Sequence, residues 1–192
     1  MRPPSGIDEN RASDAAATLV ILTRVEGLLC DEVGGPAHVP RDALRILAAC
    51  GVPLVFVTDA SAQDVIEFQR ELRLRAPFIC ERGAALHLPP DQPADPVSDE
   101  GEVFRFVPPD VTTAVTCLRG LLTARRRTDV LMVGLGCDHR DCDLLAAVDI
   151  PIVVREQSGD QASLLRRFPD AYVTRATGID GWSEALLGSP LQ

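Results

Sequence analysis

A short apolar segment followed by a turn constrains this chain more than any other feature. Residues 18–23 read Thr-Leu-Val-Ile-Leu-Thr, a pattern that favours a short buried β-strand. Arg24 and Glu26 come directly after this strand, and Gly27 marks a turn. In open α/β sheets, binding sites form at the carboxyl ends of the strands. We therefore expect the functional site to lie where this segment ends.

Short apolar runs alternate with helical patterns along the rest of the chain. The runs predict strands at 53–58, 77–80, 102–107, 129–134, 150–154 and 171–174, and the patterns predict helices at 40–50, 61–74, 108–122, 144–148 and 181–187. Residues 102–107 alternate between charged and apolar types, as an edge strand does. This order predicts an α/β fold with a doubly wound parallel sheet and helices on both faces.

Two stretches have the composition of segments outside a core. Residues 1–16 are rich in Pro, Ser, Asp and Ala and show no apolar period, which predicts a flexible N-terminal arm. Residues 89–101 are acidic and contain four prolines, which is typical of an exposed loop. We expect residues 17–192 to form a single core domain that carries this loop.

Charge and composition argue against several classes of partner and location. The net charge of −9 disfavours a nucleic acid or an anionic membrane surface as a partner, because binding either requires a dominant basic face. No apolar run approaches the roughly 20 residues that a membrane span needs. Six cysteines without the spacing of a secreted domain, and a start without an apolar leader, predict reduced thiols and a cytoplasmic location.

Five stretches together resemble the haloacid-dehalogenase-like phosphatase superfamily, and within it the mannosyl-3-phosphoglycerate phosphatase family. They occur in the order that the family has and span most of residues 18–187. The stretches are Leu22-Thr-Arg-Val-Glu-Gly-Leu-Leu29, Val55-Phe-Val-Thr-Asp-Ala-Ser61, Phe78-Ile-Cys-Glu-Arg-Gly-Ala-Ala-Leu86, Gly134-Leu-Gly-Cys-Asp-His-Arg-Asp141 with its continuation to Val154, and Thr177-Gly-Ile-Asp-Gly-Trp-Ser-Glu-Ala185.

The resemblance implies a role for particular positions. The family's first stretch supplies an Asp nucleophile and an Asp general acid/base, the second a hydroxyl that holds the phosphoryl group, the third a Lys, and the fourth acidic ligands for Mg²⁺. In this chain the nucleophile position is Arg24, the acid/base position is Glu26 and the hydroxyl is Thr58. The metal-ligand positions are Cys137 and Asp141. Mg²⁺ is thus the cofactor implied for any activity that remains.

The substituted positions depart from that chemistry. A guanidinium has no attacking lone pair and stays protonated, so Arg24 cannot form a phosphoenzyme. Glu26 is one methylene longer than Asp, which would misplace proton transfer by roughly an ångström. The chain contains no Lys, so Arg125 and Arg127 are the candidates for the missing phosphate-binding cation. The interval from 86 to 128 is short, so we expect the family's substrate-selecting cap domain to be largely absent.

Alternatives remain open for the site residues. Arg24 either pairs with Glu26 and Asp141 as an internal substitute for Mg²⁺, binds an anion beside Thr58, or reaches solvent at a disused strand end. Cys137 has a second interpretation, since with His139 and Cys142 it offers thiolate and imidazole ligands for a transition metal. In the alternative to that metal site, Cys142 faces the core.

These features support three hypotheses of function. The first is a degenerate phosphatase-like protein that acts as a binding or regulatory pseudoenzyme, with a small anionic ligand or a protein as its partner. The second is an active Mg²⁺-dependent phosphatase of a small phosphorylated metabolite, and the third is a structural subunit of a complex. Loss of a cap exposes an apolar rim, so we also expect self-association or docking on another protein.

Overall fold

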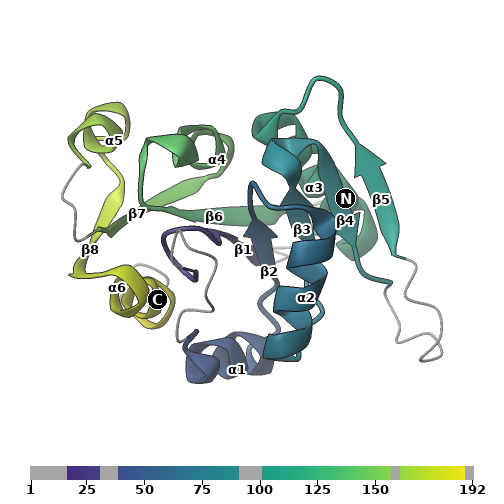
Figure 1. Cartoon of the computed structure of the whole chain (residues 1–192), viewed down its shortest axis with the longest axis horizontal. Helices are drawn as coiled ribbons and strands as arrows, with labels where there is room; N and C mark the ends of the chain where they lie inside the picture. The colour runs from purple at the N-terminus through teal and green to yellow at the C-terminus, as the bar shows by residue number, and fades with distance from the viewer. Residues whose placement is uncertain (1–16, 31–38, 91–100, 157–160, 189–192) are drawn as a thin grey trace, which may run out of the picture.

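The computed structural model describes residues 17–30, 39–90, 101–156 and 161–188 (Figure 1). The arm at 1–16 and residues 91–100 of the expected Pro-rich loop lie outside the described residues. The strands are β1 Thr18–Arg24, β2 Leu54–Val57, β3 Phe78–Cys80, β4 Ala85–Leu88, β5 Glu102–Arg105, β6 Val130–Gly136, β7 Ile150–Arg155 and β8 Tyr172–Thr177. The helices are α1 Arg41–Ala49, α2 Ala62–Leu72, α3 Val111–Arg126, α4 Cys142–Ala147, α5 Ala162–Arg167 and α6 Gly178–Leu187, with short 3₁₀ helices η1 Glu81–Gly83 and η2 His139–Asp141.

The described strands form one eight-stranded sheet in the order β5-β4-β3-β2-β1-β6-β7-β8. The pairs β3-β2, β2-β1, β1-β6, β6-β7 and β7-β8 are parallel, which confirms the predicted α/β fold. The pairs β3-β4 and β4-β5 are antiparallel. The sequence did not predict that antiparallel edge. Its physical reason is the connection between β3 and β4, because η1 is far too short for the crossover that parallel strands require.

The η1 turn depends on left-handed backbone. Glu81, Arg82 and Gly83 all have positive φ, at 53°, 58° and 88°. A Cβ added at Gly83 would lie 2.4 Å from the backbone nitrogen of Val111 at the start of α3. Only glycine fits there, so the turn depends on this residue.

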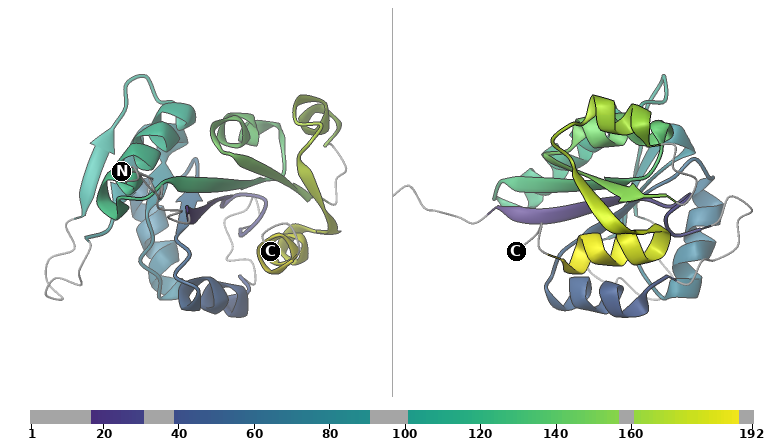
Figure 2. Two further views of the ribbon diagram at one scale, coloured as in Figure 1. Left: turned by 180° about the vertical axis from the view of Figure 1, so that it is seen from behind. Right: turned by 90° about the vertical axis from the view of Figure 1, so that its left-hand side faces the viewer.

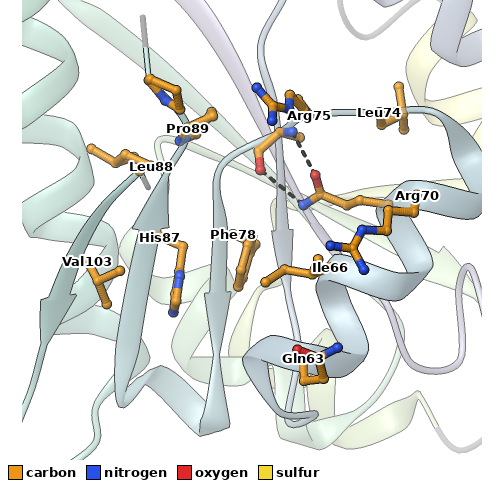
Figure 3. Close-up of a pocket in the computed structure, with 14 residues that line it drawn as sticks. Gln63, Ile66, Arg70, Leu74, Arg75, Phe78, His87, Leu88, Pro89 and Val103 are labelled. Carbon is orange, nitrogen blue, oxygen red and sulfur yellow. Dashed lines mark hydrogen bonds between the residues drawn. The ribbon is translucent and has the colours of Figure 1, made fainter. Parts of the chain in front are cut away.

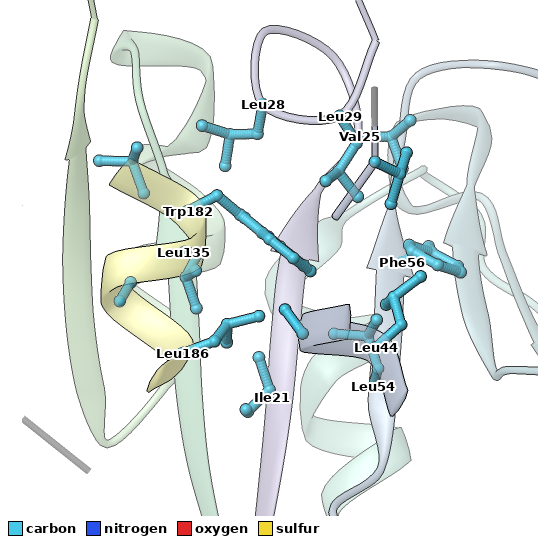
Figure 4. Close-up of a cluster of buried hydrophobic side chains, with 14 of the residues drawn as sticks. Ile21, Val25, Leu28, Leu29, Leu44, Leu54, Phe56, Leu135, Trp182 and Leu186 are labelled. Carbon is cyan, nitrogen blue, oxygen red and sulfur yellow. The ribbon is translucent and has the colours of Figure 1, made fainter. Parts of the chain in front are cut away.

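Side chains of β1 alternate between the two faces of the sheet and so supply both cores. Ile21 packs with residues of α1, α2 and α6, and Figure 4 shows it near Leu44 and Trp182. Val20 and Leu22 point to the other face and pack with α3 and α4. Figure 2 shows α1 and α6 on one side of the sheet and α4 and α5 on the other. The central strand is therefore buried on both faces, as its unbroken apolar run predicts.

Between β4 and β6 the described residues form β5 and α3; α3 buries Ala114, Val115 and Leu118 in the core, and Phe104 of β5 packs against it. Residues 91–100 of this interval lie outside the described residues, so the near absence of a cap stays a prediction. Helix α5 and strand β4 are elements that the sequence did not predict. In the described ranges, no helix is both long and apolar enough to cross a membrane.

Candidate functional site

The structure brings several of the expected residues together at one edge of the sheet. β1, β2 and β6 are neighbours, and Arg24, Thr58 and Cys137 stand at or just beyond their carboxyl ends. Parallel strands meet at a common edge, so these side chains lie close to one another. η2 follows β6 and adds Asp141 to the same edge.

The turn after β1 fixes the position of Glu26. The Val25 amide donates to the Val57 carbonyl at 3.0 Å, and the Gly27 amide donates to the Cys30 carbonyl at 2.9 Å. Val25, Leu28 and Leu29 are buried beneath the turn. Backbone hydrogen bonds and apolar burial together hold this segment, and Glu26 projects from it.

Arg24 is the centre of an ion cluster. Its side chain is only 5% exposed, with Nε 3.1 Å from Oε2 of Glu26 and 3.4 Å from Oδ1 of Asp141. Its Nη2 atom lies 2.8 Å from Oδ1 of Asp59. The predicted ion pairs with Glu26 and Asp141 are therefore present, and the interpretation of Arg24 as a solvent-reaching side chain is wrong.

Asp59 is a member of this cluster that the sequence did not suggest, although its place directly after Thr58 at a strand end was the available signal. Within the described residues, Arg24 Nη2, Glu26 Oε2 and Asp141 Oδ1 have no hydrogen-bond partner of good geometry, so opposite charge holds these contacts. Burial alone would lower the pKa of Arg24, but Glu26, Asp59 and Asp141 outweigh it and raise that pKa.

Asp141 is almost fully buried and held by the backbone. Its Oδ2 atom accepts hydrogen bonds from the amides of Cys137, at 2.7 Å, and Asp138, at 3.2 Å. Burial raises its pKa to about 6, against the opposing effect of those amides and of Arg24. A Cβ at Gly136 would lie 2.5 Å from Cβ of Asp141, so the close approach of η2 to β6 requires glycine there.

Thr58 is occupied by the chain's own carboxylate. Its hydroxyl donates a hydrogen bond to Oε1 of Glu26, and the Asp59 amide donates to the same oxygen at 2.9 Å. The Ala60 amide donates to Oγ1 of Thr58 at 3.0 Å. In this arrangement the anion beside Thr58 and Arg24 is Glu26 itself.

The residues present do not fit Mg²⁺. This ion needs oxygen ligands at roughly 2.0–2.1 Å, and the guanidinium of Arg24 lies between the oxygens of Glu26 and Asp141 that would provide them. Burial strongly raises the pKa of the Cys137 thiol, which keeps it neutral and unsuited to a hard cation. Across the part of the chain that the structure describes, no group of three or more His, Cys, Asp or Glu side chains is placed to hold a metal. Cys142 packs against a core cluster.

Arg125 and Arg127 do not reach this edge. Arg125 pairs with Glu102 at 2.8 Å, and Arg127 follows α3 beside Thr128, whose hydroxyl lies 2.9 Å from that of Thr18 at the start of β1. Both arginines are thus at the opposite edge of the sheet, and the expectation that they supply the missing cation here is wrong. The exposed Arg82 is nearer, with Nε 3.7 Å from Oδ2 of Asp59.

A cavity of about 540 Å³ lies apart from the ion cluster, between α2 and strands β3 to β5 (Figure 3). Phe78 and His87 form part of its wall, with their rings stacked at 4.4 Å. None of its lining residues belongs to the cluster around Arg24. Arg24, Glu26, Thr58, Cys137 and Asp141, the site residues expected at the strand ends, therefore lie outside this cavity.

Comparison with known proteins gives two curated relatives, while no family model matches the chain. A glucosyl-3-phosphoglycerate/mannosyl-3-phosphoglycerate phosphatase of Methanococcoides burtonii is 29% identical over 118 residues, 61% of this chain and 43% of that protein. A phosphatase of the same name from Persephonella marina is 34% identical over 71 residues, 37% of this chain and 26% of that protein. The chain thus spans less than half the length of these relatives.

Solved structures share the fold at low sequence identity. A haloacid dehalogenase-like hydrolase of B. subtilis has a TM-score of 0.61 at 11% identity, covering 88% of this chain and 98% of that one. The cobalt-bound deoxy-D-mannose-octulosonate 8-phosphate phosphatase of Haemophilus influenzae has a TM-score of 0.52 at 16% identity, covering 89% and 87%. These likenesses establish the arrangement of the sheet and helices around the strand ends.

Proposed function

We propose that this chain, which resembles the mannosyl-3-phosphoglycerate phosphatases and shares the fold of haloacid-dehalogenase-like hydrolases, is a phosphatase-like pseudoenzyme of that family. It lacks phosphoaspartate catalysis and acts by binding a small ligand or a protein partner. The observation that carries this proposal is the buried guanidinium of Arg24 in contact with three carboxylates.

Charge and geometry at the strand ends support the proposal. A phosphoenzyme needs a nucleophile at the end of β1, and a protonated guanidinium cannot attack phosphorus. Arg24 contributes one positive charge where a divalent ion would contribute two, so the cluster with Glu26, Asp59 and Asp141 has an excess of negative charge. That excess repels a phosphate ester.

A second candidate is a hydrolase in which Asp141 or Glu26 activates water directly. The raised pKa of Asp141, about 6, favours it, since such a value suits proton transfer near neutral pH. Against it, Asp141 accepts two amide hydrogen bonds and faces Arg24, and Glu26 accepts from Thr58 and Asp59. The remaining oxygens, Oε2 of Glu26 and Oδ1 of Asp141, both face the guanidinium of Arg24.

The decisive assay is hydrolysis of p-nitrophenyl phosphate in the presence of Mg²⁺. We expect no activity from the natural protein above that of a Glu26→Gln variant purified in the same way. The triple variant Arg24→Asp, Glu26→Asp, Cys137→Asp restores the acidic residue types, and we expect it to gain Mg²⁺-dependent activity. Hydrolysis by the natural protein that Glu26→Gln abolishes would overturn the proposal. A protein partner that co-purifies with an inactive chain favours the regulatory or structural hypothesis.

A further inference from the structure

Two hydrogen-bond donors and one cation converge on the carboxylate of Glu26. The Thr58 hydroxyl and the Asp59 amide both donate to Oε1, and Nε of Arg24 faces Oε2 at 3.1 Å. These donors come from the ends of two adjacent strands, β1 and β2. A hydroxyl, a backbone amide and a guanidinium that meet at one point form a cradle for an oxyanion.

The position of the Glu26 carboxylate is fixed by its backbone and by its hydrogen-bond donors. Its backbone belongs to the turn fixed by Val25 and Gly27, and its side chain is 24% exposed. Glutamate is one methylene longer than aspartate, which extends the reach of the carboxylate by roughly 1.5 Å toward Thr58. The Ala60 amide in turn orients the Thr58 hydroxyl by donating to its oxygen.

We infer that the Glu26 carboxylate is a built-in anion that closes this cradle to inorganic phosphate and other small oxyanions. The inference rests on the proposed loss of catalysis and deepens it, because it identifies the group that excludes the ligand. An external phosphate needs the same donors that Glu26 already occupies. Asp59 and Asp141 add negative charge within reach of Arg24, which further disfavours a second anion.

The same geometry indicates what removal of the carboxylate does. Glu26→Ala leaves the Thr58 hydroxyl and the Asp59 amide without their common acceptor, Oε1, and removes one of the three carboxylates that face Arg24. Buried donors without an acceptor are costly, so a small anion from solution gains by filling the space. The opened cradle thus takes a tetrahedral oxyanion with millimolar affinity, since the nearby carboxylates limit the attraction.

The test is titration with inorganic phosphate, followed by ³¹P NMR and isothermal calorimetry. We expect no saturable binding by the natural protein or by Glu26→Gln, whose side chain still fills the cradle. Glu26→Ala binds phosphate in the millimolar range, sulfate competes, and adding Thr58→Val weakens the binding about fivefold or more, the worth of one hydrogen bond. The matched control is Glu67→Ala, which removes the same charge from the exposed face of α2 and leaves the cradle closed.

Two results would overturn the inference. One is phosphate binding by the natural protein that Thr58→Val abolishes, because the cradle would then be open. The other is a Glu26→Ala protein that is folded by circular dichroism and binds no phosphate, and Glu26→Ser serves the same purpose where the alanine variant does not fold. If the phosphate titration contradicts this inference, the hydrolysis assay can still show an inactive natural protein, and the proposed function stands. If the natural protein hydrolyses the ester, the proposed function is refuted, whether or not the variants bind phosphate.

Discussion

Arg24 places a buried positive charge at the carboxyl end of β1. Its guanidinium is desolvated, so it is stable there only because carboxylates from three different segments surround it. Those carboxylates in turn depend on it, since Asp141 is 1% exposed. Arg24 and its three carboxylates therefore stabilise one another at this site.

Replacing Arg24 by Ala therefore destabilises the protein strongly. We expect a loss of about 3–5 kcal/mol in the free energy of unfolding, because three carboxylates lose their buried cation. Urea denaturation measures this loss. The matched control is Arg45→Ala, whose pair with Asp42 is exposed on both sides and is worth less than about 1 kcal/mol. Equal losses in the two variants would contradict the role assigned to the cluster.

The sequence predicted part of this site and missed part of it. Arg24, Glu26 and Thr58 were predictable as neighbours because each lies at or just beyond the end of a strand of a parallel sheet, and the family resemblance placed Asp141 with them. The place of Arg125 was not predictable from composition, because a basic run does not show which end of the sheet its helix reaches. Which carboxylate oxygen meets which donor depends on side-chain conformations that the sequence does not determine.

At the level of elements, α6 is tied to β1 by a buried hydrogen bond between residues 159 positions apart. Trp182 is fully buried and its Nε1 donates to Oγ1 of Thr23 at 2.9 Å. That bond holds the helix over the strand whose end carries Arg24. The sequence predicted a helix at 181–187 but contained no sign of this hydrogen bond.

Trp182→Phe and Thr23→Val test this connection. Each change is expected to lower the free energy of unfolding by about 1–3 kcal/mol, because a buried polar group or its partner is lost. The double variant should cost less than the sum by about 0.5 kcal/mol or more, as residues in contact are coupled. Thermal and urea unfolding of the four proteins provide the cycle, and strict additivity would show that the bond contributes nothing.

His87 on β4 makes stability depend on pH. Burial lowers its pKa, the nearby Arg105 lowers it further, and Glu81 opposes them. The folded protein thus favours neutral His87, whereas the unfolded chain takes up a proton below about pH 6.5. The contribution of this group to stability is complete above that pH and is lost as pH falls toward the lower pKa of the folded protein.

His87→Phe retains a ring against Phe78 and removes the titration. We expect the natural protein to lose stability relative to this variant as the pH is lowered from neutral to mildly acidic. Urea denaturation at a series of pH values measures the difference, and NMR titration of the imidazole reports the pKa directly. A difference that stays constant with pH would contradict this prediction.

The whole molecule is organised around strands that serve both cores. β1 supplies Ile21 to the core beneath α1 and α6 and Leu22 to the core beneath α3, so neither core is complete without it. We predict that the 17–192 core unfolds as one cooperative unit. Calorimetry should give a single transition with equal van't Hoff and calorimetric enthalpies, and two separate transitions would show two domains instead.

Most of this architecture was predictable because apolar periodicity repeats from strand to helix along the chain. The exceptions are short elements whose order comes from their surroundings. Helix α5 has six residues and a single fully buried side chain, Leu164. β4 was not predicted because its place as an antiparallel strand depends on the left-handed turn at η1.

The mutual dependence of the charges at the strand ends also limits which single substitutions the chain can accept at this site. Arg24→Asp alone removes the buried guanidinium and places a fourth carboxylate beside Glu26, Asp59 and Asp141. Glu26→Asp alone shortens the side chain that occupies the Thr58 hydroxyl while leaving Arg24 in the way of a metal ion. Arg24→Asp alone is thus expected to lower stability, and neither single change by itself frees the oxygens that a metal ion would need. A change to the acidic residue types of a phosphatase site therefore requires several substitutions at once.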